Sequence, residues 1–134
     1  MSEAKALARW SDCYGKGQSA VDLAIEREVF GAVIGARGYT TVAQADELAD
    51  RLALRPPMRL LDIGAGRGWP GLYLAERSGC AVVLTDLPFP ALRDALVRAR
   101  RQGLARRCAA LVASGSRLPF RPRAFDAIVH TDTL

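Results

Sequence analysis

The stretch LLDIGAGRGWPG, at residues 60–71, constrains the fold of this chain more than any other feature. A short apolar run leads directly into three glycines at alternating positions, Gly64, Gly66 and Gly68. An apolar run of this kind is typical of a strand that is buried on both faces of a parallel sheet. Glycines behind such a strand allow a ligand to approach the backbone closely, so the stretch predicts a ligand-binding turn.

Apolar runs and helical patterns alternate along the rest of the chain. We expect strands over residues 59–63, 80–85, 109–113 and 125–130, and helices over about 69–78 and 90–102. Alternation of this kind implies parallel strands that are joined by right-handed crossovers. The predicted fold class is therefore α/β, with a Rossmann-like parallel sheet.

The N-terminal part of the chain has a different pattern, which predicts helices only. Ser19 and Thr41 each begin a sequence that resembles a capping box, the signature of a helix N-terminus. The apolar spacing after Ser19 predicts a helix that continues to the glycines Gly35 and Gly38. The spacing after Thr41 predicts a second helix, which ends before the two prolines at 56 and 57.

Composition narrows the partners that the chain can have. Its 134 residues suit a single domain, and arginine outnumbers lysine by 17 to 2, with a net charge of +5. A GC-rich genome accounts for such arginine usage, and a basic surface for nucleic acid is the alternative. No aromatic residue interleaves with the densest arginine cluster, at 98–107, which disfavours nucleic acid as a partner.

The cysteines indicate neither a disulfide framework nor a metal site. Cys13, Cys80 and Cys108 lie far apart, and the chain has a single histidine, whereas a zinc site needs more ligands at closer spacing. The N-terminus does not have the pattern of a signal peptide, and no apolar stretch is long enough to span a bilayer. We therefore expect free thiols in a reducing compartment and a cytoplasmic protein.

Two acidic residues indicate which ligand the glycine turn binds. Asp86 ends the second strand, 20 residues after Gly66, where an acidic side chain can accept hydrogen bonds from ribose hydroxyls. GRGWPG at 66–71 also fits the GxGxxG spacing of dinucleotide sites. Asp62, however, would repel a pyrophosphate at about 4–6 Å by roughly 3–4 kcal/mol. The same carboxylate would attract the ammonium and sulfonium of S-adenosylmethionine, which has no phosphate.

Three stretches, LLDIGAGRG, LTDLP, and RLPF followed by FDAIVH, occur in this order and carry a family resemblance. Together they make residues 60–134 similar to the class I S-adenosylmethionine-dependent methyltransferases, especially the small-molecule branch. The resemblance implies methyl transfer to a small-molecule acceptor, S-adenosylmethionine as the cofactor, and the strand order 3-2-1-4. It also implies a cofactor-binding core over 58–134 and a helical lid or cap over 1–57.

The same resemblance implies a set of cofactor-binding residues at the strand ends. These residues are Asp62, Gly64, Ala65, Gly66, Gly68, Asp86, Leu87, Ser114, Gly115 and Tyr39. Tyr39, together with Tyr14, would cover the cofactor, because aromatic faces attract a sulfonium. Ser114 stands where many family members carry an acidic residue that contacts the adenine, and a serine oxygen accepts without charge assistance. Arg67, inside the loop, would either reach the cofactor carboxylate or point into solvent.

A general base is needed only for some methyl acceptors. His130 and Asp132 are the candidates for this role, because both would lie at the mouth of the active site beyond the fourth strand. A strand-end histidine that bonds to the backbone, and an aspartate that caps a loop, are the alternative interpretations of these two residues.

The family fold has seven strands, whereas this sequence stops just beyond the fourth. We expect a core that is truncated after strand four, and its open edge is a liability for an isolated domain. A homo-oligomer or a partner chain would cover this edge. A non-catalytic binding fragment and a dinucleotide-binding oxidoreductase domain remain alternatives to the methyltransferase.

Overall fold

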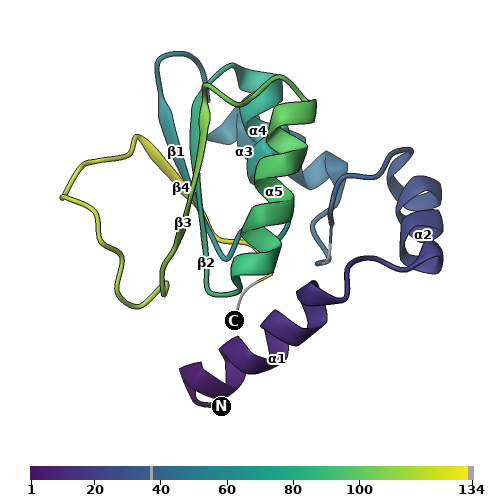
Figure 1. The fold of residues 1–134 in the computed structure, drawn as a ribbon. Helices are drawn as coiled ribbons and strands as arrows, with labels where there is room; N and C mark the ends of the chain where they lie inside the picture. The colour runs from purple at the N-terminus through teal and green to yellow at the C-terminus, as the bar shows by residue number, and fades with distance from the viewer. Residues whose placement is uncertain (37, 133–134) are drawn as a thin grey trace.

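A sheet of four parallel strands forms the centre of the fold (Figure 1). The computed structural model describes residues 1–36 and 38–132. Its strands are β1 (Arg59–Ile63), β2 (Ala81–Asp86), β3 (Cys108–Val112) and β4 (Ala127–Val129). Each strand pairs in parallel with its neighbours, and the order across the sheet is β3-β2-β1-β4. The predicted α/β class and the predicted strand order are therefore confirmed.

Helices cover one face of this sheet. The described part of the chain forms α1 (Glu3–Gly15), α2 (Ala20–Phe30), α3 (Val42–Arg51), α4 (Gly71–Ser78) and α5 (Phe89–Arg101). α4 connects β1 to β2, α5 connects β2 to β3, and both pack against the same side of the strands (Figure 1). α3 packs against α4 and α1 packs against α5, so these two helices form an outer layer.

The main core lies between the sheet and its crossover helices. Leu60, Val82 and Leu84 belong to the strands, Leu72 and Leu92 belong to the helices, and each is at most 2% exposed. Full burial of a leucine side chain stabilises a fold by about 1.5–3 kcal/mol relative to an exposed one. This packing fixes where β1 and β2 end, and therefore where the loops at their carboxyl ends lie.

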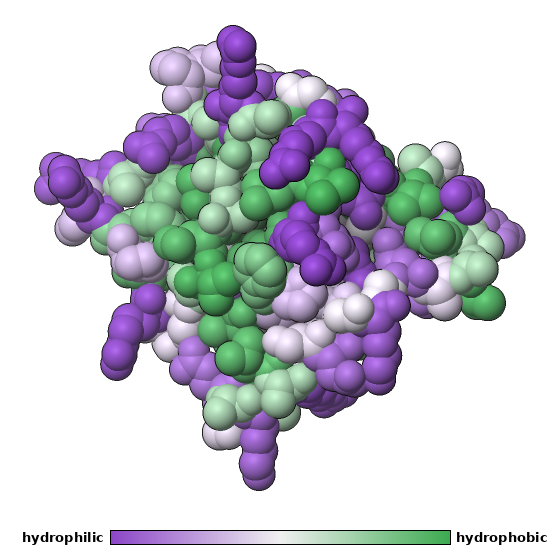
Figure 2. All heavy atoms as spheres, viewed as in Figure 1, coloured by the Kyte–Doolittle hydropathy of each residue, from purple (hydrophilic) through white to green (hydrophobic). Residues whose placement is uncertain are grey.

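The opposite face of the sheet is covered only in its centre. Leu61 of β1 is 1% exposed, and with the burial of its neighbour Leu60 this confirms the expected strand that is buried on both faces. Toward the two edges, Leu111 of β3 is 40% exposed and Ile128 of β4 is 55% exposed. Figure 2 shows hydrophobic side chains gathered over the strands in the left half of the view. Exposed apolar surface therefore lies beside β4, at the edge of the sheet.

Local signals begin and end the N-terminal helices. Ser19 and Thr41 both form the predicted capping boxes. The predicted end of α2 at Gly35 is wrong, because the helix stops at Phe30. Gly31 takes a left-handed conformation with φ of 74°, and its amide donates to a carbonyl one turn earlier, which ends the helix. The apolar spacing continues past this point, so it gave no sign of the stop.

β4 is also shorter than the strand predicted over 125–130. The carboxylate of Asp126 accepts a hydrogen bond from the Arg59 amide at 2.8 Å, and the Asp126 amide donates to the Arg59 carbonyl at 2.9 Å. This exchange aligns β4 beside β1, and pairing ends at Val129. His130 therefore follows the strand. Within the described ranges, no helix combines the length and the apolar character that crossing a membrane requires.

Candidate functional site

A cavity of about 320 Å³ lies at the carboxyl ends of β1 and β2. Ligands bind at this end of the strands in open α/β sheets, and the volume falls in the range of small-molecule sites. The loop after β1, the end of β2 and helix α1 contribute most of the wall. The lining includes Gly64, Ala65, Gly66, Arg67, Asp86, Leu87, Trp10 and Tyr14. The structure thus brings the first part of the predicted glycine loop together with the end of β2.

Asp86 holds the glycine loop in place and also faces the cavity. One carboxylate oxygen accepts a hydrogen bond from the Gly66 amide at 2.7 Å, and the other accepts one from the Leu87 amide at 2.8 Å. Burial raises the pKa of Asp86, and the two backbone hydrogen bonds oppose this shift. Because each oxygen has a second lone pair, Asp86 can still accept hydrogen bonds from two ligand hydroxyls.

Asp62 lies beneath the loop and is absent from the cavity wall. It is 1% exposed, and its carboxylate accepts a hydrogen bond from the Gly71 amide at 2.9 Å, where α4 begins. Burial raises the pKa of Asp62 well above its ordinary value, the Gly71 hydrogen bond lowers it, and nearby Asp86 raises it further. The carboxylate therefore fixes the start of α4, and Asp62 does not line the cavity in which the sequence places a ligand.

The backbone of the loop depends on two of its glycines. Gly64 and Gly66 have φ values of 72° and 54°, in the left-handed region that favours glycine. The amides of Gly64 and Ala65 both donate to the Thr85 carbonyl, at 2.8 and 3.0 Å. A Cβ at Gly66 would lie 2.8 Å from the Tyr14 hydroxyl oxygen, so this position also requires glycine for space. The loop is thus tied to β2 on one side and covered by α1 on the other.

Arg67 and Tyr14 join the loop to α1. Arg67 is 3% exposed, its guanidinium lies 4.8 Å from the centroid of the Tyr14 ring, and its Nη2 donates to the Tyr14 carbonyl at 3.4 Å. A desolvated cation–π contact contributes about 2 kcal/mol. The alternative prediction that Arg67 points into solvent is therefore wrong, because α1 covers it. Sequence analysis missed Trp10 as a lining residue, although its i, i+4 spacing to Tyr14 places both rings on one helical face.

Asp132 connects the segment after β4 to the N-terminal part of the chain. Its carboxylate accepts hydrogen bonds from the Thr40 amide at 3.0 Å and from the Thr40 hydroxyl at 2.7 Å. Burial raises the pKa of Asp132, but the hydrogen bonds from Thr40 and from the Tyr39 amide outweigh burial and leave the pKa below its ordinary value. The Thr40 carbonyl accepts a hydrogen bond from the Trp69 indole at 2.9 Å. Asp132 lines the cavity, but its hydrogen bonds are structural.

Tyr39 and His130 lie away from this cavity. Tyr39 is 94% exposed and lines a separate hollow beside α3, so of the two tyrosines expected over the cofactor Tyr14 is the one that lines the cavity. His130 is exposed and does not line the cavity. Of the two predicted bases, Asp132 is therefore the one that the structure brings to the site.

The loop after β3 is also separate from the cavity wall. The Ser114 hydroxyl bonds to the Ser116 hydroxyl at 2.8 Å, and a Cβ at Gly115 would lie 3.1 Å from Ile63. Gly68 has a packing role, because a Cβ there would lie 2.5 Å from the Leu72 side chain. Across the described ranges, no group of three or more His, Cys, Asp or Glu side chains could hold a metal ion.

Residues 60–134 match the family model that is described as a methyltransferase domain. The match covers more than half of the chain and includes the glycine loop and Asp86. The chain belongs to the methyltransferase-domain family. Membership confirms the resemblance to class I methyltransferases and favours it over the dinucleotide-binding alternative.

Relatives of this methyltransferase domain are longer proteins. The 24-methylenesterol C-methyltransferase 2 of Oryza sativa subsp. japonica is 33% identical over 86 residues, which are 64% of this chain and 24% of that protein. The structure of geranyl diphosphate C-methyltransferase from Streptomyces coelicolor A3(2), in complex with Mg²⁺, geranyl diphosphate and S-adenosyl-L-homocysteine, is 28% identical with a TM-score of 0.61. This match covers 66% of our chain and 33% of that chain.

A third relative has the same fold at lower identity. The structure of a SAM-dependent methyltransferase from Thiobacillus denitrificans, in complex with S-adenosyl-L-homocysteine, is 21% identical with a TM-score of 0.61 and covers 79% of our chain and 42% of that chain. The methyltransferase domain described here thus spans about a quarter of the curated plant relative and less than half of each of these two solved structures.

Proposed function

We propose that this methyltransferase domain binds S-adenosylmethionine in the cavity at the ends of β1 and β2, for methyl transfer to a small molecule. One observation carries the proposal: Asp86 faces the cavity while its carboxylate holds the Gly66 amide at 2.7 Å. An acidic side chain in this place accepts hydrogen bonds from the two hydroxyls of a ribose. The cavity of about 320 Å³ is large enough for a small-molecule ligand.

The hydrogen bonds of the loop amides support a ligand without phosphate. A dinucleotide site uses free N–H groups at the start of a helix to bind the pyrophosphate. Here the amides of Gly64 and Ala65 donate to Thr85, and the amide of Gly66 donates to Asp86. These three donors are therefore taken within the protein, which favours S-adenosylmethionine over NAD(P).

The aromatic and basic residues of the cavity wall suit a cation with a carboxylate beside it. The rings of Trp10 and Tyr14 line the cavity, and aromatic faces attract a sulfonium. Arg67 lines it as well, as the cation that would pair with the cofactor carboxylate. Asp62 contributes from beneath the loop, because a positive charge in the cavity would favour the ionised form of its buried carboxyl.

S-adenosylmethionine supplies an activated methyl group on its sulfonium when bound. The residues of this chain position the reactants and exclude water, and in-line positioning supplies much of the rate of such a transfer. Asp132 has a lowered pKa and is hydrogen bonded to Thr40, so it is a weak proton acceptor. Its role in this proposal is that of a positioning residue, which holds the segment around Thr40 at the cavity.

The acceptor belongs to the small-molecule class in this proposal. The relatives that support this class are named for a sterol and for geranyl diphosphate. Residues 1–57 act as the lid or cap of the core at 58–134, since Trp10 and Tyr14 of α1 line the cavity. A second copy or a partner chain covers β4, where Ile128 is 55% exposed. The free thiols of Cys80 and Cys108 support a cytoplasmic location.

Calorimetric titration of the purified chain with S-adenosylmethionine and with NAD tests the proposal. We expect heat from S-adenosylmethionine and none from NAD. Asp86→Asn removes the charge that assists the ribose hydrogen bonds, so its affinity for S-adenosylmethionine should fall by about tenfold. Binding of NAD without binding of S-adenosylmethionine would overturn the proposal.

Glu76→Gln is the matched control for this titration. Glu76 lies on the exposed side of α4 and does not line the cavity. The variant removes the same charge as Asp86→Asn, and its affinity should equal that of the unchanged protein. An equal loss in both variants would mean that the cofactor responds to overall charge and not to the end of β2.

A further inference from the structure

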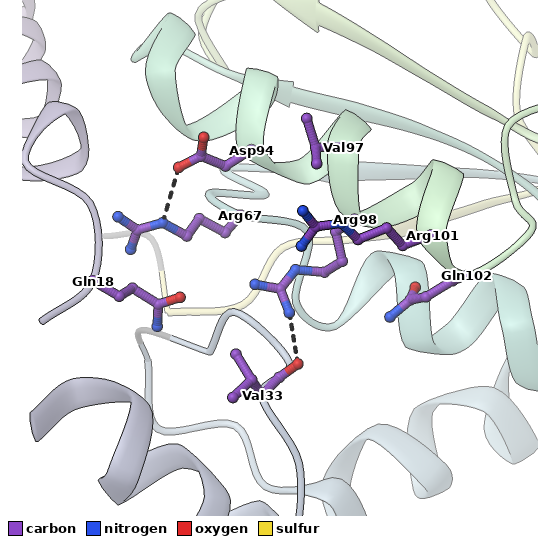
Figure 3. A pocket seen from close by; sticks show the side chains of 8 residues that line it. All are labelled: Gln18, Val33, Arg67, Asp94, Val97, Arg98, Arg101 and Gln102. Atoms are coloured by element: carbon purple, nitrogen blue, oxygen red, sulfur yellow. Dashed lines mark hydrogen bonds and ion pairs between the residues drawn. The ribbon is translucent and has the colours of Figure 1, made fainter. Parts of the chain in front are cut away.

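A second cavity, of about 450 Å³, lies beside α5 (Figure 3). Arg98 and Arg101 of α5 line it together with Gln102, the residue that follows this helix, and Arg67 lines it from the glycine loop. Val33, from the segment that follows α2, lies on the opposite side of the hollow in Figure 3. Neither the predicted cofactor site nor its mechanism uses this cavity.

Positive charge exceeds negative charge in the wall of this cavity. The lining residues carry three guanidinium groups, those of Arg67, Arg98 and Arg101, and one carboxylate, that of Asp94. The ion pair between Arg67 Nε and Asp94 is long, at 3.4 Å. Arg98 donates to a neutral partner, the Val33 carbonyl, at 2.8 Å. Both contacts are drawn in Figure 3, and only the contact with Asp94 has an anionic acceptor.

A buried carboxylate behind the wall offsets this excess only in part. Glu26 is 4% exposed, and one of its oxygens accepts hydrogen bonds from the amides of Ile34 and Gly35 at 2.9 and 3.0 Å. Its other oxygen accepts a hydrogen bond from the Gln18 amide group. Burial lowers the pKa of Arg98, Glu26 raises it, and Arg67 lowers it again, as expected for a cation that is only partly compensated.

Two polar atoms in this wall lack hydrogen-bond partners. Among the described residues, Arg98 Nε and Gln102 Oε1 are the buried side-chain atoms in this condition. A buried polar group without a partner costs about 1–3 kcal/mol. Arg98 and Gln102 are one helical turn apart at the end of α5, so both project from the same side of the helix.

We infer that the cavity beside α5 binds a small tetrahedral oxyanion of the phosphate class, free or as the phosphoryl group of a larger ligand. Arginine forks bind such oxygens with paired hydrogen bonds. The anion would accept from the guanidinium groups of Arg98 and Arg101 and from the side-chain NH₂ of Gln102, all three of which line the cavity. Arg67 lines this cavity and the one at the ends of β1 and β2, so the two ligands would be neighbours. The inference stands independently of S-adenosylmethionine.

Titration with inorganic phosphate at constant ionic strength tests the inference. We expect binding with a Kd below about 1 mM for the unchanged protein. Arg101→Gln should weaken binding by about tenfold, because it removes a charge-assisted donor at an exposed position that the fold does not need. Gln102→Glu should weaken it at least as much, because it adds a like charge at the same volume.

Arg100→Gln is the matched control, since Arg100 lies on α5, is exposed and does not line the cavity. Its phosphate affinity should be unchanged. An equal loss in Arg100→Gln and Arg101→Gln would overturn the inference in favour of diffuse attraction by the arginine-rich helix. Should Gln102→Glu fail to fold, the comparison between Arg100→Gln and Arg101→Gln still decides the matter.

Methyl phosphate and inorganic pyrophosphate, titrated in the same way, distinguish the two sources of the anion. Binding of methyl phosphate at least as tight as that of inorganic phosphate supports the phosphoryl group of a larger ligand. Binding of inorganic phosphate alone supports the free ion. No binding of any of the three at about 10 mM would overturn the inference.

Discussion

The carboxyl ends of the central strands β1 and β2 hold their side chains more firmly than the carboxyl ends of the outer strands β3 and β4 do. At the ends of β1 and β2, Asp62 and Thr85 are each 1% exposed, and Asp86 is bonded to two backbone amides. Beyond β3 and β4, Ser114 bonds to a neighbouring serine and His130 is exposed. The difference accompanies the connections, because β1 and β2 lead into α4 and α5, whereas no helix follows β3 or β4 in the described part of the chain.

The comparison shows how a binding loop acquires a fixed shape. Carboxylates that accept backbone N–H groups determine where the loop runs, and burial makes those hydrogen bonds more important than they would be in water. Asp62 holds the start of α4 and Asp86 holds Gly66. Beyond β3 and β4, the carboxylates of Asp126 and Asp132 also accept backbone N–H groups, but both residues are exposed.

The largest effect should come from overfilling the space beneath the loop. A Cβ at Gly71 would lie 2.4 Å from the Asp62 carboxylate and 3.0 Å from Leu84. Gly71→Ala should therefore lower the free energy of unfolding by about 3 kcal/mol, as measured by urea denaturation. Gly15→Ala is the control, since a Cβ there meets nothing within 4 Å. A Gly71→Ala variant as stable as the control would remove the distinction between the two regions.

A smaller, pH-dependent effect should come from the charge of Asp62. Its pKa is raised by burial in the folded protein, so the folded state binds a proton more tightly than the unfolded state does. Below the pKa of the unfolded state, about 4, Asp62 is protonated in both states and the raised pKa does not lower the free energy of unfolding. Above that pH the free energy of unfolding falls until the pH passes the pKa of the folded state. Asp62→Asn keeps the acceptor for Gly71 and removes the charge. The variant should therefore gain stability relative to the unchanged protein as the pH rises above about 4.

Urea denaturation at a series of pH values measures this difference. Asp86 also has a raised pKa and repels the Asp62 carboxylate, so loss of the Asp62 charge relieves this repulsion and adds to the gain in stability. A loss of stability in Asp62→Asn that grows with pH would show that Asp62 has a cationic partner, as the sequence predicted for the bound cofactor.

The smallest effects should come from the loops beyond β3 and β4. Ser114→Ala and His130→Gln change side chains that do not line the cavity, so each should alter stability by less than about 0.5 kcal/mol. Affinity for S-adenosylmethionine, measured by calorimetry, should stay within about twofold in both variants. A tenfold loss of affinity for S-adenosylmethionine in Ser114→Ala would show that the loop after β3 contacts the bound ligand. The ends of β2 and β3 would then both take part in binding.

The sequence predicted the covered half of the molecule well for a physical reason. β1 spans Arg59–Ile63 as predicted, because a short apolar run between a polar start and a glycine has few other ways to be buried. The place of Asp86 followed from its distance along the chain to Gly66, since a parallel pair puts both strand ends at one edge of the sheet. Local pattern and tertiary packing agree in this half.

The rest of the site depends on how the N-terminal segment packs, which local pattern does not contain. α2 ends at Phe30 and not at Gly35, Tyr39 in the segment that follows is exposed, and Tyr14 of α1 lies over the loop. Arg67 looked like a solvent-facing loop residue, yet α1 buries it to 3% exposure. Nothing in the glycine loop itself indicates a helix that begins more than 50 residues earlier.

The central position of β1 also sets an order of assembly. β1 can pair with β2 once the short helix α4 has formed, whereas Asp126 must reach Arg59 across 67 residues and Asp132 must reach Thr40 across 92. Contacts between distant residues form more slowly, because each requires a longer loop to close. The cavity at the ends of β1 and β2, whose wall includes α1 and Asp132, is therefore completed late in folding. A ligand that binds there selects chains in which the most distant contacts have already been made.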